Sequence, residues 1–272
     1  MNGVSGPVID RLGTRLGYAL TIAWWSAAAV LHAFARGAFS LGAARFLLGM
    51  GEAGNWPGAV KVVAEGFPER ERALASGIFN SGSAVGAILA APSYLRHARH
   101  LRMSAIGKYS WIPFVVAGIG NYAGGWLSGY LLRRGWSVTA ARKTGVTFFA
   151  ALMTAAIPAV LVGDSRVSIA LVSVAMLGYT GASANMLSMP ADVFPKNAVA
   201  SVWGLASMGS GFGGMLFTLV TGWAVDHFSY TPVFLGFGVL PLICAAILWM
   251  FLGPLERLAP IAANQKISFN PN

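Results

Sequence analysis

Residues 197–225 read NAVASVWGLASMGSGFGGMLFTLVTGWAV, and no Asp, Glu, Lys or Arg interrupts this run. A helix needs about 20 mostly apolar residues to cross the hydrocarbon core of a bilayer. This run is therefore long enough to span a membrane, and it is too long for a single buried strand. The fold class of the chain depends on how many such runs it contains.

Seven runs that are long enough to span a membrane are free of these four residue types, and an eighth apolar stretch, over 38–64, is interrupted by only three charges. The seven runs cover residues 16–35, 73–95, 109–132, 144–163, 167–191, 197–225 and 227–255. The connections between them are short, so no soluble domain fits between neighbouring runs. We predict an all-α integral membrane protein with about eight transmembrane helices.

The composition excludes an ordinary soluble enzyme. Of the 272 residues, 56% are hydrophobic and 10% are charged, whereas soluble domains carry about 25% charged residues. The net charge of +10 does not indicate nucleic-acid binding, because the Lys and Arg residues form no basic stripe. Cys244 has no disulfide partner, and the four histidines lack the spacing of metal ligands. We expect no metal, no cofactor and no enzymatic activity.

The orientation follows from the Lys and Arg residues in the short connections. If the runs cross the membrane alternately, eleven of these residues lie on the side of both termini and six lie on the other side. Because Lys and Arg favour the cytoplasmic side, we predict that both termini are cytoplasmic. Residues 94–105 would then face the outside.

An internal repeat relates the two parts of the chain. AEGFPERERALASG at 64–77 aligns without a gap with ADVFPKNAVASVWG at 191–204. Parallel repeats occur in transporters whose two halves are related by an axis along the membrane normal. The two copies are separated by three full spans, whereas a six-span repeat requires five. Two spans are therefore absent from the middle of the chain.

Several motifs resemble the major facilitator superfamily. The segment GPVIDRLGTR at 6–15 resembles its G-x-x-x-D-R-x-G-x-R loop between helices two and three. Residues 44–88, which begin ARFLLGMGEAGNWPGAV, resemble helices four and five of the anion:cation symporter family, in particular its hexuronate and sugar-acid transporters. Residues 93–107 and 124–143 are similar to the segment between that family's helices seven and eight and to the end of its helix eight.

The resemblance implies an incomplete helical bundle. Residues 1–92 would form a partial N-terminal half with helices three to five, residues 93–253 a partial C-terminal half with helices eight to twelve, and residues 254–272 a cytoplasmic tail. Helices one, two, six and seven have no counterpart. In this family helices one and seven line the central cavity, so the resemblance also implies that this chain transports poorly or not at all.

Arg45 and Glu52 are charged residues inside a predicted span. From their spacing in the sequence, they lie about 20° apart around a helix and about 10 Å along it, and Asn55 follows close to the same face. Charges at this depth are costly and usually face a bundle interior or a wet cavity. One interpretation is an ion pair that fixes helix packing. The family resemblance favours another, in which Arg45 binds an anion and Glu52 carries a proton.

Further polar residues within apolar runs are candidates for lining the same sugar-acid cavity, namely Asn80, Tyr179, Ser183 and Asn185. For each of them, a hydrogen bond between helices is an equally good interpretation. The residues of the cytoplasmic loop motif are Gly6, Asp10, Arg11, Gly13 and Arg15. They resemble a latch between helix ends, and the alternative is a positively charged flank without a further role.

The resemblance implies secondary active transport, in which a proton and a hexuronate or a related sugar acid or organic anion cross the inner membrane together. The expected partners are the lipid bilayer, the anion and the proton. The chain has no G-x-x-x-x-G-K-[ST] phosphate loop, so we expect no use of ATP. Two alternatives are a non-transporting remnant of such a transporter and an intramembrane enzyme. The enzyme is disfavoured, because Glu52 is the one acid well inside a predicted span.

Overall fold

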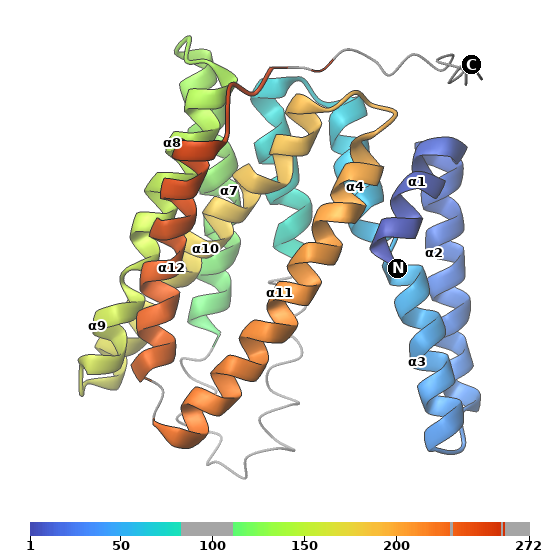
Figure 1. The fold of residues 1–272 in the computed structure, drawn as a ribbon, viewed down its shortest axis with the longest axis horizontal. Helices are drawn as coiled ribbons and strands as arrows, with labels where there is room; N and C mark the ends of the chain where they lie inside the picture. The colour runs from blue at the N-terminus through green and yellow to red at the C-terminus, as the bar shows by residue number, and fades with distance from the viewer. Residues whose placement is uncertain (83–110, 229–230, 257, 259–272) are drawn as a thin grey trace, which may run out of the picture.

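The structure is a computed structural model that describes residues 1–82, 111–228, 231–256 and 258, and every regular element in these ranges is helical (Figure 1). The helices are α1 (Asn2–Leu12), α2 (Thr14–Leu31), the 3-10 helix η1 (His32–Phe34), α3 (Ala38–Glu52), α4 (Asn55–Gly66), a helix over 69–82, α7 (Ile112–Arg133), α8 (Val138–Met153), α9 (Ala156–Leu161), α10 (Ser165–Val193), α11 (Val199–His227) and α12 (Thr231–Phe251). The predicted all-α fold is confirmed.

Five helical segments of the described residues are long and apolar enough to cross a membrane. They cover Thr14–Phe34, Val138–Leu161, Arg166–Val193, Val199–Ala224 and Thr231–Phe251. The described part of the predicted run 109–132 forms α7 from Ile112 onward, and the stretch 38–64 is divided between α3 and α4. The run 73–95 leaves the described residues after position 82, and the predicted outside segment 94–105 lies beyond them.

The predicted loop at 6–15 is wrong. Gly6, Asp10 and Arg11 lie within α1, and Arg15 belongs to α2. Gly13 alone separates the two helices, with a φ of 81° that suits glycine because it has no Cβ atom. The new helix packs closely: a Cβ atom on Gly6 would lie 2.3 Å from the carbonyl oxygen of Ala200, so α1 lies directly against α11.

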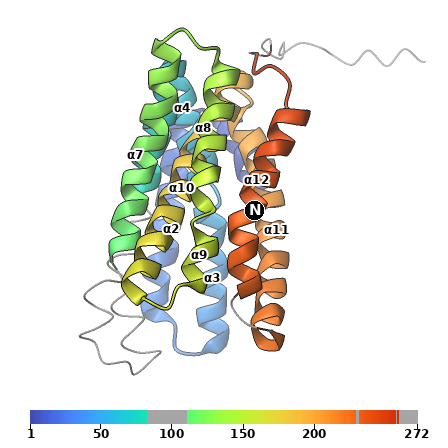
Figure 2. The same cartoon turned by 90° about the vertical axis from the view of Figure 1, so that its left-hand side faces the viewer.

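Other helix pairs approach as closely as α1 and α11 do, and glycine makes each approach possible. Gly124 of α7 lies against the backbone of Gly181 in α10, and Gly125 lies against the backbone of Leu74 in the helix over 69–82. Small residues at such positions let membrane helices gain van der Waals contact without a hydrophobic driving force. Figure 2 shows α7, α8 and α10 side by side, in agreement with their many mutual contacts.

The helix bounds agree with the internal repeat. When position 64 is aligned with position 191, residues 38–66 align with residues 165–193. The first range contains α3 and α4, and the second range forms α10, so the helices begin and end at equivalent positions. The two copies differ in one respect: α10 is continuous, whereas the first copy is interrupted after Glu52.

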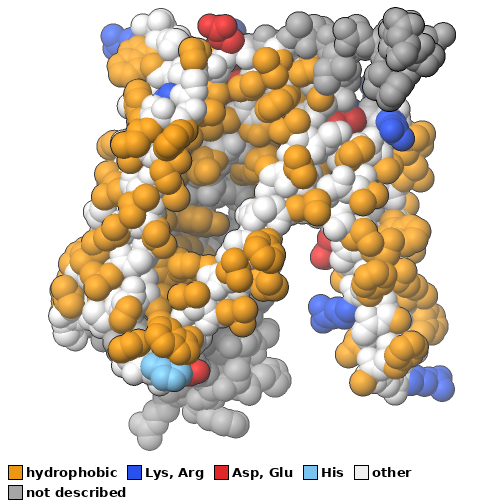
Figure 3. All heavy atoms as spheres, in the orientation of Figure 1, with side chains coloured by type: hydrophobic (Ala, Val, Ile, Leu, Met, Phe, Trp, Pro, Cys, Tyr) orange, Lys and Arg blue, Asp and Glu red, His pale blue; other side chains and the backbone are white. Residues whose placement is uncertain are grey.

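Large apolar side chains cover much of the outer surface (Figure 3). In the most apolar window of α11 only 6% of the residues are buried within the protein, and in that of α12 the share is 17%. In water such a surface would be an aggregation site. In a bilayer, lipid tails solvate these side chains, while the helices satisfy their own backbone groups.

The predicted orientation places Arg36 and Arg134 on opposite sides of the membrane, and both side chains are exposed in connections between helices. We expect a cysteine introduced as Arg36→Cys to react with a membrane-impermeant thiol reagent in intact cells. Arg134→Cys should react only after permeabilisation, because Lys and Arg of its segment favour the cytoplasm. Both variants should carry Cys244→Ser to remove the native thiol. The reverse labelling pattern would refute the predicted orientation.

Candidate substrate and coupling site

The first copy of the repeat contains a broken helix, and Pro57 explains the break. A proline inside a continuous helix lacks a donor N–H and clashes with the carbonyl group four residues earlier, here that of Ala53. The Ala53 carbonyl oxygen instead accepts a hydrogen bond of 2.8 Å from Ser5 Oγ of α1. The repeat counterpart of Pro57 is Ala184, so α10 continues through this level.

The break lies beside a hollow of about 660 Å³. Its lining comes from α1, α2, α3, α4 and the turn between α3 and α4. The lining residues are Asn2, Trp25, Ala29, Leu48, Gly49, Glu52, Ala53, Asn55 and Trp56. Glu52 is the last residue of α3 and its side chain is exposed. Interrupted helices are typical of the binding sites of secondary transporters. Here the interruption is a single turn over Ala53 and Gly54, and both residues keep helical φ and ψ angles.

The predicted site residues lie on both sides of the break. Arg45 and Glu52 lie on α3 before it, and Asn55 lies on α4 after it. Arg45 is exposed on α3 two turns before Glu52, and Asn55 begins α4, where its Oδ1 accepts a hydrogen bond of 2.7 Å from the Tyr18 hydroxyl. Within the described residues, Arg45 and Glu52 form no ion pair shorter than 4.0 Å. The structure therefore provides no direct Arg45–Glu52 contact that would fix helix packing.

The other predicted cavity residues lie on the helix over 69–82 and on α10. Asn80 Nδ2 donates a hydrogen bond of 2.8 Å to Asn121 Oδ1 of α7. Tyr179 is exposed, and Ser183 Oγ donates to its carbonyl oxygen. Asn185 is fully buried, and its Nδ2 donates to the carbonyl oxygens of Gly124 and Gly181. Asn185 thus links α10 to α7, and Tyr179 occupies the repeat position of Glu52.

Asp10 joins three helices at the opposite end of α1 from the hollow. Its carboxylate accepts a hydrogen bond of 2.8 Å from Lys61 Nζ of α4 and one of 2.7 Å from the backbone N–H of Ser201 in α11. The N-cap of α11 is Ala198, whose side chain caps nothing. Asp10 therefore supplies the cap from another helix, where a negative charge is favoured by the helix dipole.

This geometry fits the latch interpretation for Asp10. The side chains of Asp10 and Lys61 are 5% and 3% exposed, so the ion pair is buried. The other charged residues of the motif, Arg11 and Arg15, lie on the surface. Lys61 was not predicted as the partner of Asp10, although it is one of the charges that interrupt the apolar stretch 38–64.

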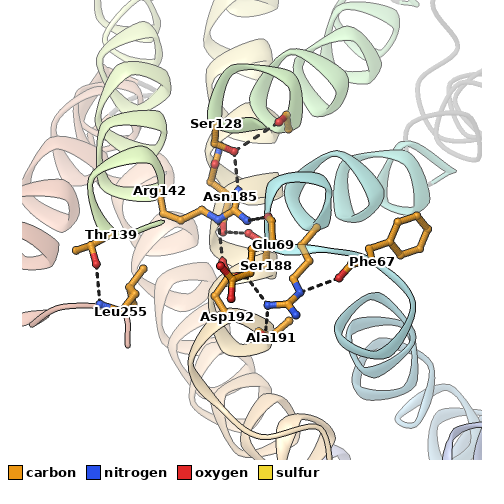
Figure 4. Close-up of polar contacts among 12 residues, drawn as sticks. Phe67, Glu69, Ser128, Thr139, Arg142, Asn185, Ser188, Ala191, Asp192 and Leu255 are labelled. Atoms are coloured by element: carbon orange, nitrogen blue, oxygen red, sulfur yellow. Dashed lines mark hydrogen bonds and ion pairs between the residues drawn. The ribbon is translucent and has the colours of Figure 1, made fainter. Parts of the chain in front are cut away.

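A second buried cluster, the Asp192 cluster, consists of Asp192, Arg72 and Arg142 (Figure 4). Asp192 accepts a hydrogen bond of 3.0 Å from Arg72 Nη1 and one of 2.8 Å from Arg142 Nε. Arg142 also donates to Ser128 Oγ and to the carbonyl oxygen of Glu69. The cluster thus ties together α10, α8, α7 and the helix over 69–82.

From the sequence, the residues of the Asp192 cluster were interpreted as ordinary charges between spans. Arg72 and Arg142 counted toward the cytoplasmic side, and both are buried. The repeat held a clue, because Asp192 aligns with Glu65, and Glu65 likewise bonds across helices through Thr14 Oγ1.

The fold and these contacts define a class of protein: a membrane-embedded bundle with an internal repeat, a broken helix and ion clusters between helix ends, as in secondary transporters. The sequence profile of the Major Facilitator Superfamily matches residues 1–94 and 89–269. The chain therefore belongs to this superfamily.

Among its relatives is the hexuronate transporter of Escherichia coli strain K12, which is 24% identical over 352 aligned residues that cover 93% of this chain and 82% of the relative. The D-galactonate transporter of Escherichia coli O6:H1 is 20% identical, with 93% and 83% covered. The galacturonate transporter of Dickeya chrysanthemi is 38% identical over 119 residues, with 43% and 32% covered. The 352 aligned residues exceed the 272 of this chain, so the hexuronate transporter contains residues that this chain does not match.

We expect Asp192→Asn to destabilise the protein strongly. Removing the carboxylate leaves two buried guanidinium groups without their counter-charge, and breaking a buried ion pair in this way costs about 3–5 kcal/mol. The free energy of unfolding of the purified protein in detergent measures the loss. The matched control is Glu71→Gln, because Glu71 pairs with Arg70 on the surface at 3.7 Å, and it should cost less than about 1 kcal/mol. Equal effects of the two substitutions would contradict the proposed role of the cluster.

Proposed function

We propose that this protein is a proton-coupled symporter for a hexuronate or a related sugar acid or organic anion in the inner membrane, with both termini in the cytoplasm. The observation that carries the proposal is the position of Glu52. It is a carboxylate at the break of a membrane helix, exposed beside a hollow and two turns from an exposed arginine. The names of the relatives support a sugar acid as the substrate.

Arg45 is the residue that binds the substrate carboxylate in this proposal. A guanidinium group is always charged and presents a planar fork that matches a carboxylate in two parallel hydrogen bonds. Hydroxyl groups of the sugar acid require polar side chains that both donate and accept. Asn55 lines the hollow and is the residue proposed for this role. The other predicted cavity residues, Asn80, Tyr179, Ser183 and Asn185, do not line the hollow, and Asn185 is fully buried with its amide group bonded to α7 and α10.

The coupling of proton binding to substrate binding follows from the charges of Arg45, Glu52 and the anion. Without substrate, Arg45 stabilises the negative charge of Glu52. An anion bound to Arg45 cancels this attraction, so Glu52 binds a proton together with the substrate. When the anion leaves, the attraction returns and Glu52 releases the proton.

The proposal predicts that substrate binding takes up a proton through Glu52. Calorimetric titration of the purified full chain with galacturonate, in buffers that differ in ionisation enthalpy, measures this uptake. We expect up to about one proton per bound anion in the parent protein and none in Glu52→Gln, which should still bind. Arg45→Ala should lose binding, because the carboxylate then has no cationic partner.

Glu71→Gln is the matched control, because Glu71 is an acid that lies on the surface. Its proton uptake should equal that of the parent protein. If Glu52→Gln takes up as many protons as the parent, the proton site lies elsewhere.

A second candidate function is a non-transporting remnant, and the uncovered glycines of α11 favour it. A Cβ atom placed on Gly209, Gly211, Gly213 or Gly214 would have no atom of the described residues 1–82, 111–228, 231–256 and 258 within 4 Å. Glycines in a membrane helix usually lie against another helix, and no described helix covers these glycines, as the remnant function would require. Uptake of labelled galacturonate by proteoliposomes under an inward proton gradient distinguishes a symporter from a non-transporting remnant. A symporter concentrates the anion, whereas a remnant gives the same uptake as protein-free liposomes.

A further inference from the structure

The Asp192 cluster is buried, and yet its charges do not balance (Figure 4). It contains two guanidinium groups, those of Arg72 and Arg142, but a single carboxylate, so one positive charge has no counter-charge in the cluster. Within the described residues, no second carboxylate lies within 4.0 Å of either guanidinium group. A buried charge is costly unless an opposite charge lies close to it. The cluster therefore favours the binding of an anion beside it.

Arg72 is the member of the cluster that has unused hydrogen-bond donors. Its Nε donates to the carbonyl oxygen of Phe67, and its Nη1 donates to Asp192 and to the carbonyl oxygen of Ala191. Its Nη2 makes no hydrogen bond to a described residue, whereas all three side-chain nitrogens of Arg142 donate. The Arg72 side chain is only 4% exposed, so these free N–H groups have little access to water.

Arg72 lines a second hollow, which has a volume of about 600 Å³. This hollow lies between the start of the helix over 69–82 and the connection from α7 to α8. Its lining residues are Pro68, Glu69, Arg70, Arg72, Leu132, Trp136, Ser137 and Val138. An anion in this hollow would lie next to the uncompensated charge of the Asp192 cluster.

Positive groups outnumber negative groups around this hollow. Its lining contains two arginines and one acid, Glu69, whose side chain is exposed. Glu71 pairs with the exposed side chain of Arg70 at 3.7 Å. Arg133 and Arg134, at the C-terminal end of α7, add two more positive charges. The electrostatic potential of the hollow therefore favours an anion.

Aromatic side chains indicate that the hollow lies where lipid headgroups meet the hydrocarbon core. Trp126 stacks on Tyr130 with 5.5 Å between the ring centroids, and the Arg134 guanidinium group lies over the Tyr130 ring. Trp136 lines the hollow and is 46% exposed. Trp and Tyr are enriched at this level of a membrane. Leu132 supplies apolar lining beside Trp136, as an acyl chain requires.

We propose that this hollow binds the headgroup of an anionic phospholipid. The phosphate accepts hydrogen bonds from Arg72 Nη2 and from the Arg70 guanidinium group, while Glu69 accepts hydrogen bonds from headgroup hydroxyls. Basic pockets between membrane helices bind acidic lipid headgroups in this way. The bound phosphate balances the charge of the Asp192 cluster, and so it stabilises the junction of α7, α8, α10 and the helix over 69–82. This inference does not depend on the proposed transport function.

Lipid binding to the purified full chain in detergent tests the proposal. Native mass spectrometry compares phosphatidylglycerol with phosphatidylcholine of the same acyl chains. We expect a single phosphatidylglycerol to bind at least about fivefold more tightly, because phosphatidylcholine has no net negative charge. Phosphatidylglycerol should also raise the melting temperature by at least about 2 °C. Inorganic phosphate at the same concentration should not, because it lacks acyl chains.

Two substitutions locate the bound lipid. Arg70→Gln should weaken phosphatidylglycerol binding about fivefold, since one arginine near an anionic lipid contributes roughly this much. Leu132→Trp should also weaken it, because the larger side chain fills the hollow while every charge remains. The matched control is Arg15→Gln, which should bind as the parent protein does. Arg15 is exposed at the same end of the bundle, next to Thr14, whose hydroxyl bonds to Glu65.

Three results would overturn the proposal. If Arg15→Gln weakens binding as much as Arg70→Gln does, anionic lipids are attracted to the whole basic end of the bundle and not to this hollow. If phosphatidylcholine binds as tightly as phosphatidylglycerol, the hollow does not select an anionic headgroup. If inorganic phosphate raises the melting temperature as much as phosphatidylglycerol does, the ligand is a soluble anion and not a lipid.

Discussion

Backbone contact at glycine holds this bundle together. At the crossings of α1 with α11, of α7 with the helix over 69–82 and of α7 with α10, one helix lies so close to the next that a Cβ atom would collide with backbone atoms. The glycines at these crossings are Gly6, Gly77, Gly120, Gly124, Gly125 and Gly204. Lipid tails are as apolar as the side chains, so burial of apolar surface contributes little to helix association in a membrane. Close packing and interhelical hydrogen bonds must supply the stability instead.

Buried charges lie close to the crossings that these glycines make. Asp10 caps α11 near the contact between Gly6 and Ala200, and the Asp192 cluster reaches the start of the helix over 69–82 near the contact between Gly125 and Ala73. Each cluster links elements from both parts of the chain. An ion pair in such a place has strict distance requirements, so it fixes which helix ends meet.

The sequence predicted the fold class well, because charge-free runs of sufficient length are a direct requirement of the bilayer. The repeat was also visible, since Phe-Pro at 67–68 and the surrounding small residues recur at 194–195. The helical state of residues 2–12 was not predictable from the motif, which contains no sign of the long-range contact between Gly6 and Ala200. Arg142 illustrates a similar limit: a charge next to a span looks like a surface residue until its partners Asp192 and Ser128 are known.

Pro57 distinguishes the two copies of the repeat and connects the fold to the proposed chemistry. It interrupts the first copy beside Glu52, whereas the second copy continues through Tyr179. The central claim is that Glu52 changes its protonation state when an anion binds. Infrared difference spectroscopy of the purified protein tests this claim directly, because a protonated carboxylic acid has a carbonyl band that a carboxylate lacks. Addition of galacturonate should produce this band in the parent protein and not in Glu52→Gln. A band of equal size in both proteins, or a parent protein that binds galacturonate without producing the band, would contradict the claim.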